Sequence, residues 1–179
     1  MTRYIVLGNG NLTILYDKYY TIRELYYPLT TTNNCEAIRI GFMVDGKFSW
    51  IHNLNPYVNY CDEALCSIAK LKFNNINLEI LDTVDMAYDV LVRRIKVDGD
   101  KEVKLCLGFS LNINNIPDGD TALYDPNSDS IIHYKGSKWF LISSDIPFDS
   151  YATGQKGFKG FEGTWRDCED GRLSGNKIA

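Results

Sequence analysis

The sequence has few histidines and lacks the cysteine motifs that build metal and redox sites. Its two histidines, His52 and His133, lie far apart and have no other ligands around them at zinc-binding spacing. The five cysteines form no C-x-x-C pair. Cys61 and Cys66 stand at a spacing that belongs to no thiol motif, and we interpret them as two incidental cysteines. We therefore expect no zinc site and no redox pair, and we expect a reduced, cytoplasmic location.

A calcium site is not expected either. The segment Asp125–Asp129 places oxygen atoms at alternate positions, as the start of a calcium loop does. Ser130 then stands where the loop glycine belongs, and Gly136 where the bidentate glutamate belongs. An ordinary turn is the better interpretation, so the sequence predicts neither a bound metal nor a cofactor.

A surplus of basic residues and a long apolar run are also missing. There are 19 Lys and Arg against 23 Asp and Glu, a net charge of -4 without charge blocks. Nucleic acids and anionic membranes both favour a basic face. The segment Met1–Gly10 has only a short apolar run without a small-residue cleavage site, and no stretch reaches the length of a membrane span. We expect neither nucleic acid nor a membrane as partner.

What the chain does contain is a repeated pattern of short strands joined by turns. A hydrophobic content of 45% excludes a disordered chain. Asp45-Gly46 separates two apolar segments and is the strongest hairpin signal. Strands are expected at residues 4–8, 11–16, 38–44, 47–50, 71–73, 78–81, 90–97, 102–109, 131–135 and 138–143. Long helical periodicity is absent, so the pattern predicts an all-β, antiparallel sandwich or barrel. The pattern stops after Ser144, which predicts a β domain over residues 1–145 and a mostly irregular linker over 146–179.

Three passages, taken in order, resemble the N-terminal domain of glycoside hydrolase family 15, the glucoamylase, glucodextranase and trehalase-like proteins. They are Leu7–Leu12 continuing to Ile22–Pro28, Gly119–Pro126 with Ile132–Gly136, and Gly160–Asp167 running into Asp170–Asn176. The resemblance implies a large antiparallel supersandwich of the galactose-mutarotase-like kind, followed by a linker and an (α/α)6 barrel. In that family the barrel holds the two catalytic glutamates. This sequence ends before any such barrel, so no catalytic residue can be carried over, and we expect the chain to be inactive alone.

The last residues carry the candidate site. We interpret Trp165, Arg166, Asp167 and Asp170 as residues that pack against the absent barrel, because Trp and Arg are common at interfaces. The alternative is a sugar site in which Trp165 lies beside the carboxylates of Glu162, Asp167, Glu169 and Asp170. A local charge run is more often solvated or ion-paired, which favours the first interpretation. An apolar patch near Trp165 would also allow a homodimer.

Exposed aromatic residues are the remaining candidates for function. A sugar-binding face could be lined by Tyr19, Tyr20, Tyr26, Tyr27, Trp50, Tyr57 and Tyr60. The alternative is that these rings fill the core and cross-strand pairs, as most aromatics in β proteins do. The leading hypothesis is therefore a non-catalytic domain that supports a carbohydrate-hydrolysing barrel. The alternatives are a free-standing carbohydrate-binding module and a gene fragment without a separate role.

Overall fold

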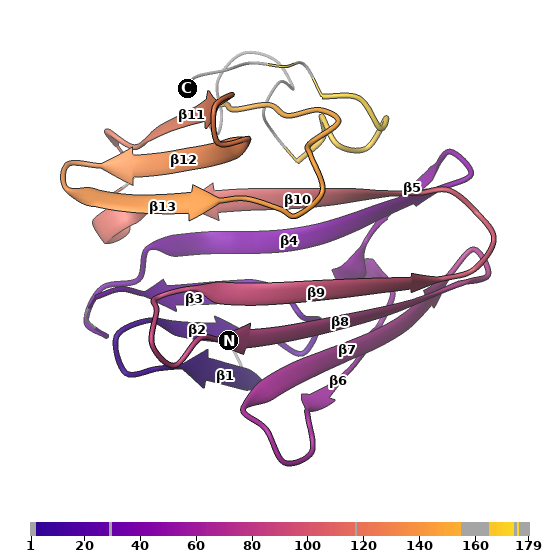
Figure 1. The fold of residues 1–179 in the computed structure, drawn as a ribbon, viewed down its shortest axis with the longest axis horizontal. Helices are drawn as coiled ribbons and strands as arrows, with labels where there is room; N and C mark the ends of the chain where they lie inside the picture. Colours follow the sequence, from indigo (N-terminus) through magenta and orange to yellow (C-terminus); the bar gives the residue numbers. More distant parts are fainter. Residues whose placement is uncertain (1–2, 29, 117, 155–164, 174, 176–179) are drawn as a thin grey trace. The chain divides into compact units, whose positions relative to one another are not determined.

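The structure, a computed structural model, describes residues 3–28, 30–116, 118–154, 165–173 and 175. These residues form thirteen strands, all paired antiparallel, and two single-turn 3-10 segments (Figure 1). The prediction of an all-β, antiparallel sandwich is confirmed. Among the described residues, no helix is long and apolar enough to cross a membrane.

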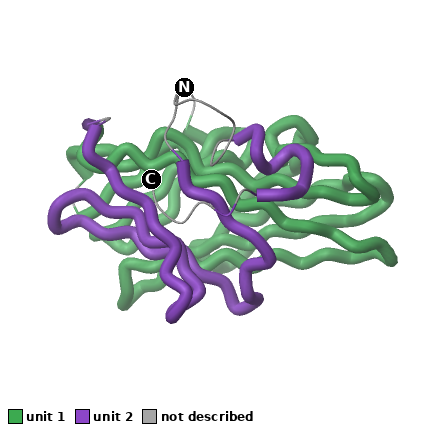
Figure 2. The backbone as a smooth tube through the Cα atoms, turned by 90° about the horizontal axis from the view of Figure 1, so that it is seen from above, with its two compact units in different colours: residues 1–115 green, residues 116–179 purple. Residues whose placement is uncertain are grey.

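The chain divides into two compact units, residues 1–115 and 116–179 (Figure 2). The first unit holds β1 to β10 and the second holds β11 to β13. The boundary expected at residue 145 follows the last described strand, which ends at Ile142, and the linker role of residues 146–179 stays a prediction. Strands on both sides of Asn115 have similar composition and alternation, so the sequence pattern does not mark the division there.

The first unit is built from two sheets. One has the order β1-β2-β3-β4-β10, with β5 paired to the same edge of β4 as β3. The other has the order β6-β7-β8-β9 (Figure 1). The bounds in the first sheet are β1 Ile5–Gly8, β2 Thr13–Tyr16, β3 Ile22–Tyr26, β4 Cys35–Val44, β5 Lys47–Trp50 and β10 Val103–Leu111. In the second they are β6 Tyr57–Tyr60, β7 Cys66–Phe73, β8 Ile76–Val84 and β9 Leu91–Asp98, and the 3-10 turns are η1 Ile51–Asn53 and η2 Ile113–Asn115.

The core of this unit lies between the two sheets. Strand β8 buries every second side chain, which is the period expected when one face of a strand meets the core. Strand β4 does the same from Ile38 to Val44. The buried faces of the two sheets meet, since the Tyr16 hydroxyl on β2 of the first sheet donates to a carboxylate oxygen of Asp82 on β8 of the second at 2.7 Å. The fold is therefore held by inter-sheet contacts as well as by strand pairing.

A charged network is buried at the same place. Arg93 donates from Nε and Nη2 to the two carboxylate oxygens of Asp82, at 2.8 and 2.6 Å, and the Asp82 side chain is fully buried. Tyr20 stacks on Tyr16 with ring centroids 4.9 Å apart and shares a 2.8 Å hydrogen bond with the Ser67 hydroxyl. Burial, reinforced by the negative charge of Asp82, raises the pKa of both tyrosine hydroxyls. Every charged member of this network thus has a partner.

The interpretation of Cys61 and Cys66 as incidental is wrong. They form a disulfide that closes the β6–β7 hairpin, where the Cys61 amide also donates to the Cys66 carbonyl at 2.8 Å. The register pairs Tyr60 with Ser67, and the next residues have Cα atoms 5.4 Å apart, within the range of a disulfide. The pairing is not predictable from the sequence pattern, because the short segment Tyr57–Tyr60 carries no clear strand signal.

The second unit contains a meander of three strands, β11 Thr121–Asp125, β12 Ser130–Lys135 and β13 Lys138–Ile142. Tyr134 and Trp139 face each other across β12 and β13 and stack with ring centroids 4.4 Å apart. Tyr124 stacks on Tyr151 at 3.8 Å, which fixes the chain after β13 to the sheet. Residues 165–171 form consecutive turns.

Candidate functional site

The residues predicted to face a barrel lie in those consecutive turns. Trp165 and Asp167 are half-buried, whereas Arg166 and Asp170 are exposed. Asp170 accepts a hydrogen bond from the backbone amide of Arg172 at 2.9 Å. Glu162, named in the alternative sugar site, lies outside the described residues. The barrel-facing role of this segment therefore stays a prediction.

The aromatic candidates separate into core and surface residues. Tyr20 and Trp50 are buried, with 0% and 6% of their surface exposed, so for them the core interpretation holds. Tyr57 is 61% exposed and Tyr60 is 40% exposed. The exposed tyrosines are therefore the ones accessible to a ligand.

Tyr19 and Tyr57 come together in an open cleft of about 380 Å³ in the first unit. The cleft is shallow and wide open to solvent, unlike the enclosed pockets that bury most of a small ligand. The residues that line it, here called the tyrosine cleft, are Tyr4, Lys18, Tyr19, Asn55, Pro56, Tyr57 and Val58. Tyr19 and Tyr57 are among the aromatic residues predicted as candidates, whereas the other residues of the cleft were not predicted.

One wall of the tyrosine cleft is the turn between β2 and β3, which Asp17 organises. One oxygen of its carboxylate accepts the backbone amides of Tyr19 at 2.9 Å and Thr21 at 3.1 Å. The other oxygen accepts Arg23 Nε at 2.8 Å. Tyr20 takes a left-handed backbone conformation with φ 63°, and its side chain enters the core. The turn thereby leaves Lys18 exposed and Tyr19 half-buried at the surface.

Another part of the lining is the chain that leaves η1 and enters β6. Asn55 has a φ of 47°, and Pro56 follows it, which starts the strand in a new direction. Within β6, Val58 is buried and Tyr57 on the other face is exposed, as strand alternation requires. Asn59 donates from its side-chain amide to the Tyr57 hydroxyl at 3.1 Å, which restricts the Tyr57 ring.

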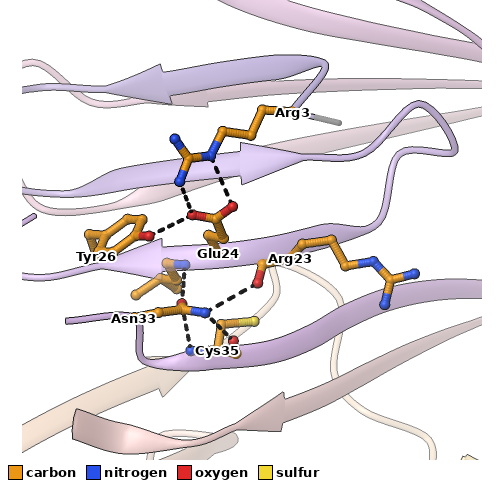
Figure 3. Close-up of polar contacts among 7 residues, drawn as sticks. Arg3, Arg23, Glu24, Tyr26, Asn33 and Cys35 are labelled. Carbon is orange, nitrogen blue, oxygen red and sulfur yellow. Dashed lines mark hydrogen bonds and ion pairs between the residues drawn. The ribbon is translucent and has the colours of Figure 1, made fainter. Parts of the chain in front are cut away.

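The tyrosine cleft is completed by Tyr4, just before β1. Its backbone amide donates to the Tyr16 carbonyl at 2.8 Å, and 51% of its surface is exposed. Arg3 next to it is occupied, because its guanidinium makes two hydrogen bonds to the Glu24 carboxylate, at 3.0 and 2.9 Å. Figure 3 shows Arg3 and Tyr26 converging on Glu24. The hydrogen bonds from Arg3 are the main reason that the pKa of Glu24 is lowered.

Tyr60 does not line the tyrosine cleft. Its hydroxyl accepts the Val6 amide at 2.8 Å and donates to the Val6 carbonyl at 3.2 Å, at the open edge of β1. These two bonds satisfy the backbone amide and carbonyl of Val6 on an edge strand, where such groups could otherwise pair with another chain. Tyr60 therefore serves the structure and holds β6 beside β1.

The chemistry that the tyrosine cleft offers is binding. Its described lining has three tyrosines, one amide and one ammonium group, and it includes no Asp or Glu. Glycoside hydrolysis in most families needs a pair of carboxyl groups, so the lining is not suited to that reaction. Among the described residues, no group of three His, Cys, Asp or Glu is arranged to hold a metal. Asp125 makes a turn instead, accepting the Asn127 amide at 3.2 Å and the Ser128 hydroxyl at 2.5 Å.

Comparisons with known proteins add no relative. Neither the models of known protein families nor the curated proteins include a match to this sequence. The resemblance to glycoside hydrolase family 15 therefore rests on the three sequence passages alone.

Proposed function

We propose that this chain is a non-catalytic β-sandwich protein that binds carbohydrate in the tyrosine cleft. The observation that supports this function is the grouping of Tyr4, Tyr19 and Tyr57 around one open cleft whose lining also includes Asn55. The C–H face of a pyranose ring stacks on tyrosine rings, and the tyrosine hydroxyls and the Asn55 amide can bond to sugar hydroxyls. An open cleft with exposed rings suits a stretch of oligosaccharide rather than a small buried ligand.

A second candidate is the supporting domain of a glycoside hydrolase family 15-like enzyme that acts on α-glucosidic bonds. The order of the three resembling passages favours it, and Trp165 and Arg166 would then face the barrel. In that case this chain is inactive alone, and the apolar area buried against the barrel contributes stability at about 25 cal/mol per Å². The two candidates are compatible, since a supporting domain can also hold substrate.

The cytoplasmic location stays a prediction. It was based on cysteines expected to be reduced, and the disulfide between Cys61 and Cys66 weakens that basis. Disulfides are rare in the cytosol outside hyperthermophiles. Alkylating the thiols in intact cells before lysis tests the location. Labelling of Cys61 and Cys66 would indicate a reducing compartment, whereas a disulfide-linked pair would escape labelling and indicate an oxidising one.

Calorimetric titration of the purified chain tests carbohydrate binding. The ligands are maltooligosaccharides, dextran oligosaccharides, trehalose, and neutral and acidic galactans. We expect saturable binding of at least one ligand class, and we expect Tyr57→Ala to weaken it about two- to ten-fold, the range for loss of a ring-stacking contact. Tyr88→Ala is the matched control, since Tyr88 is also exposed in this unit but is not among the cleft residues.

Two results would contradict the proposal. One is the absence of saturable heat with every sugar. The other is an equal loss of affinity in Tyr57→Ala and Tyr88→Ala, which would place binding elsewhere. Hydrolysis of any of these sugars by the pure chain would refute the non-catalytic part of the proposal.

A further inference from the structure

We propose that the tyrosine cleft selects acidic oligosaccharides, with the Lys18 ammonium group pairing with a carboxylate or sulfate of the sugar. This inference rests on the proposed function and names the class of ligand.

Lys18 is held at the cleft by a ring contact, and not by an ion pair with any described carboxylate. Its Nζ lies 4.8 Å from the centroid of the Tyr19 ring, a cation–π distance that keeps the ammonium group near the lining. In the part of the chain that the structure describes, no carboxylate forms an ion pair with it. Lysines 70 and 101 of the same unit differ, since Lys70 pairs with Glu79 and Lys101 with Asp45.

The carboxylates nearest to Lys18 in the chain and in the β2–β3 hairpin are already occupied. Asp17 is only 7% exposed, and its oxygens accept two backbone amides and Arg23 Nε. Glu24 is engaged by Arg3 and by the Tyr26 hydroxyl. The ion pairs with Glu24 and Asp17 also occupy Arg3 and Arg23, so neither arginine competes with Lys18 for an anion. Figure 3 shows the Arg23 side chain directed away from the Glu24 group. Lys18 is thus the one cation among the described cleft residues, and the lining has no anion.

The rings beside Lys18 indicate that the anion is part of a sugar. An isolated inorganic anion could bind the ammonium group and tyrosine hydroxyls, but it would make no use of the ring faces of Tyr4 and Tyr57. A uronic acid or sulfated sugar can place its ring on a tyrosine while its charged group reaches Lys18. Because the whole chain carries a net charge of -4, this attraction must be local. Salt will therefore weaken it, as it weakens exposed ion pairs.

The test is a calorimetric titration with three tetrasaccharides of similar ring size: neutral galactan, galacturonan, which carries carboxylates, and carrageenan, which carries sulfates. The wild type is compared with Lys18→Met, with Lys18→Arg, and with Lys47→Met. Lys47 is an exposed lysine on β5 outside the tyrosine cleft, so Lys47→Met makes the same change of net charge. Each titration is run at about 50 and about 500 mM NaCl.

We expect an acidic tetrasaccharide to bind about three- to five-fold more tightly than the neutral one, the range for a partly exposed ion pair. The difference should disappear in Lys18→Met, persist in Lys18→Arg and Lys47→Met, and shrink at high salt. If only galacturonan shows it, the anion recognised is a carboxylate; if only carrageenan shows it, the anion is a sulfate.

Other results overturn the inference. Equal affinity for the three sugars, unchanged by Lys18→Met, refutes charge selection but leaves carbohydrate binding standing. An equal loss in Lys18→Met and Lys47→Met assigns the preference to non-specific charge attraction and also refutes it. Binding of no sugar refutes both the inference and the proposed function.

Discussion

Replacing Arg93 by methionine should strongly destabilise the first unit. The substitution keeps a long apolar stem on β9 but removes the guanidinium that donates to both oxygens of Asp82. The Asp82 side chain is fully buried, and it would lose both guanidinium hydrogen bonds while keeping the one from the Tyr16 hydroxyl. An uncompensated buried charge costs far more than the pair itself contributes, so the expected loss is about 3–5 kcal/mol.

The assay is urea unfolding of the whole chain followed by circular dichroism. With a urea dependence of about 2 kcal/mol per M, the loss lowers the midpoint by about 2 M. Arg94→Met is the matched control, because Arg94 is exposed on the same strand and its loss should change stability by less than about 0.5 kcal/mol. The double variant Asp82→Asn with Arg93→Met removes the uncompensated charge, and its stability should return to within about 2 kcal/mol of the wild type.

Two outcomes would refute this reasoning. One is a loss of less than about 1 kcal/mol in Arg93→Met, which would mean that water or another cation compensates Asp82. The other is a double variant no more stable than Arg93→Met, because the cost would then come from packing rather than charge.

Three further predictions concern the same unit. Burial raises the folded-state pKa of the Tyr20 hydroxyl, so its contribution to stability is complete below pH about 10 and is lost as the pH rises further. Urea midpoints should therefore fall above this pH, and Tyr20→Phe should make the fall less steep. An unchanged slope in Tyr20→Phe would exclude Tyr20 as the source. Replacing Cys61 and Cys66 by serine should lower stability by about 2 kcal/mol through loss of loop closure, measured by thermal unfolding. Non-reducing peptide mapping should show the two linked, and unlinked peptides would contradict the pairing. Gly41→Ala should lower the free energy of unfolding by about 1–3 kcal/mol, since a Cβ at this position would overlap the Phe48 ring. Adding Phe48→Leu should restore much of this stability. A Gly41→Ala variant as stable as the wild type would show that the ring moves aside freely.

The sequence predicts the long, regular part of this fold well. Ile38–Val44 and Lys47–Trp50 alternate clearly, and Asp45-Gly46 between them takes the left-handed conformation in both residues, with φ of 51° and 70°. Local pattern and turn chemistry agree there, and this agreement is what makes a hairpin predictable. Strands β3, β6 and β11 were not predicted, because each is short and is rich in polar or tyrosine residues that also occur in loops.

The tyrosine cleft could not be derived in this way. Its residues come from three segments, around Tyr4, Lys18 and Tyr57, which meet only through strand pairing and the turn set by Asp17. Composition drew attention to Tyr19 and Tyr57 but gave equal weight to Tyr20 and Trp50, which are core residues. Whether a ring is buried or exposed depends on strand register, and a one-residue shift reverses it.

The most direct measurement of the central claim is mapping of backbone amide shifts by NMR during titration with the sugar that binds best. Carbohydrate binding in the tyrosine cleft predicts saturable shifts concentrated at Lys18, Tyr19, Asn55 and Tyr57. Shifts confined to residues 118–154 or 165–173, or no saturable shift with any sugar, would contradict it.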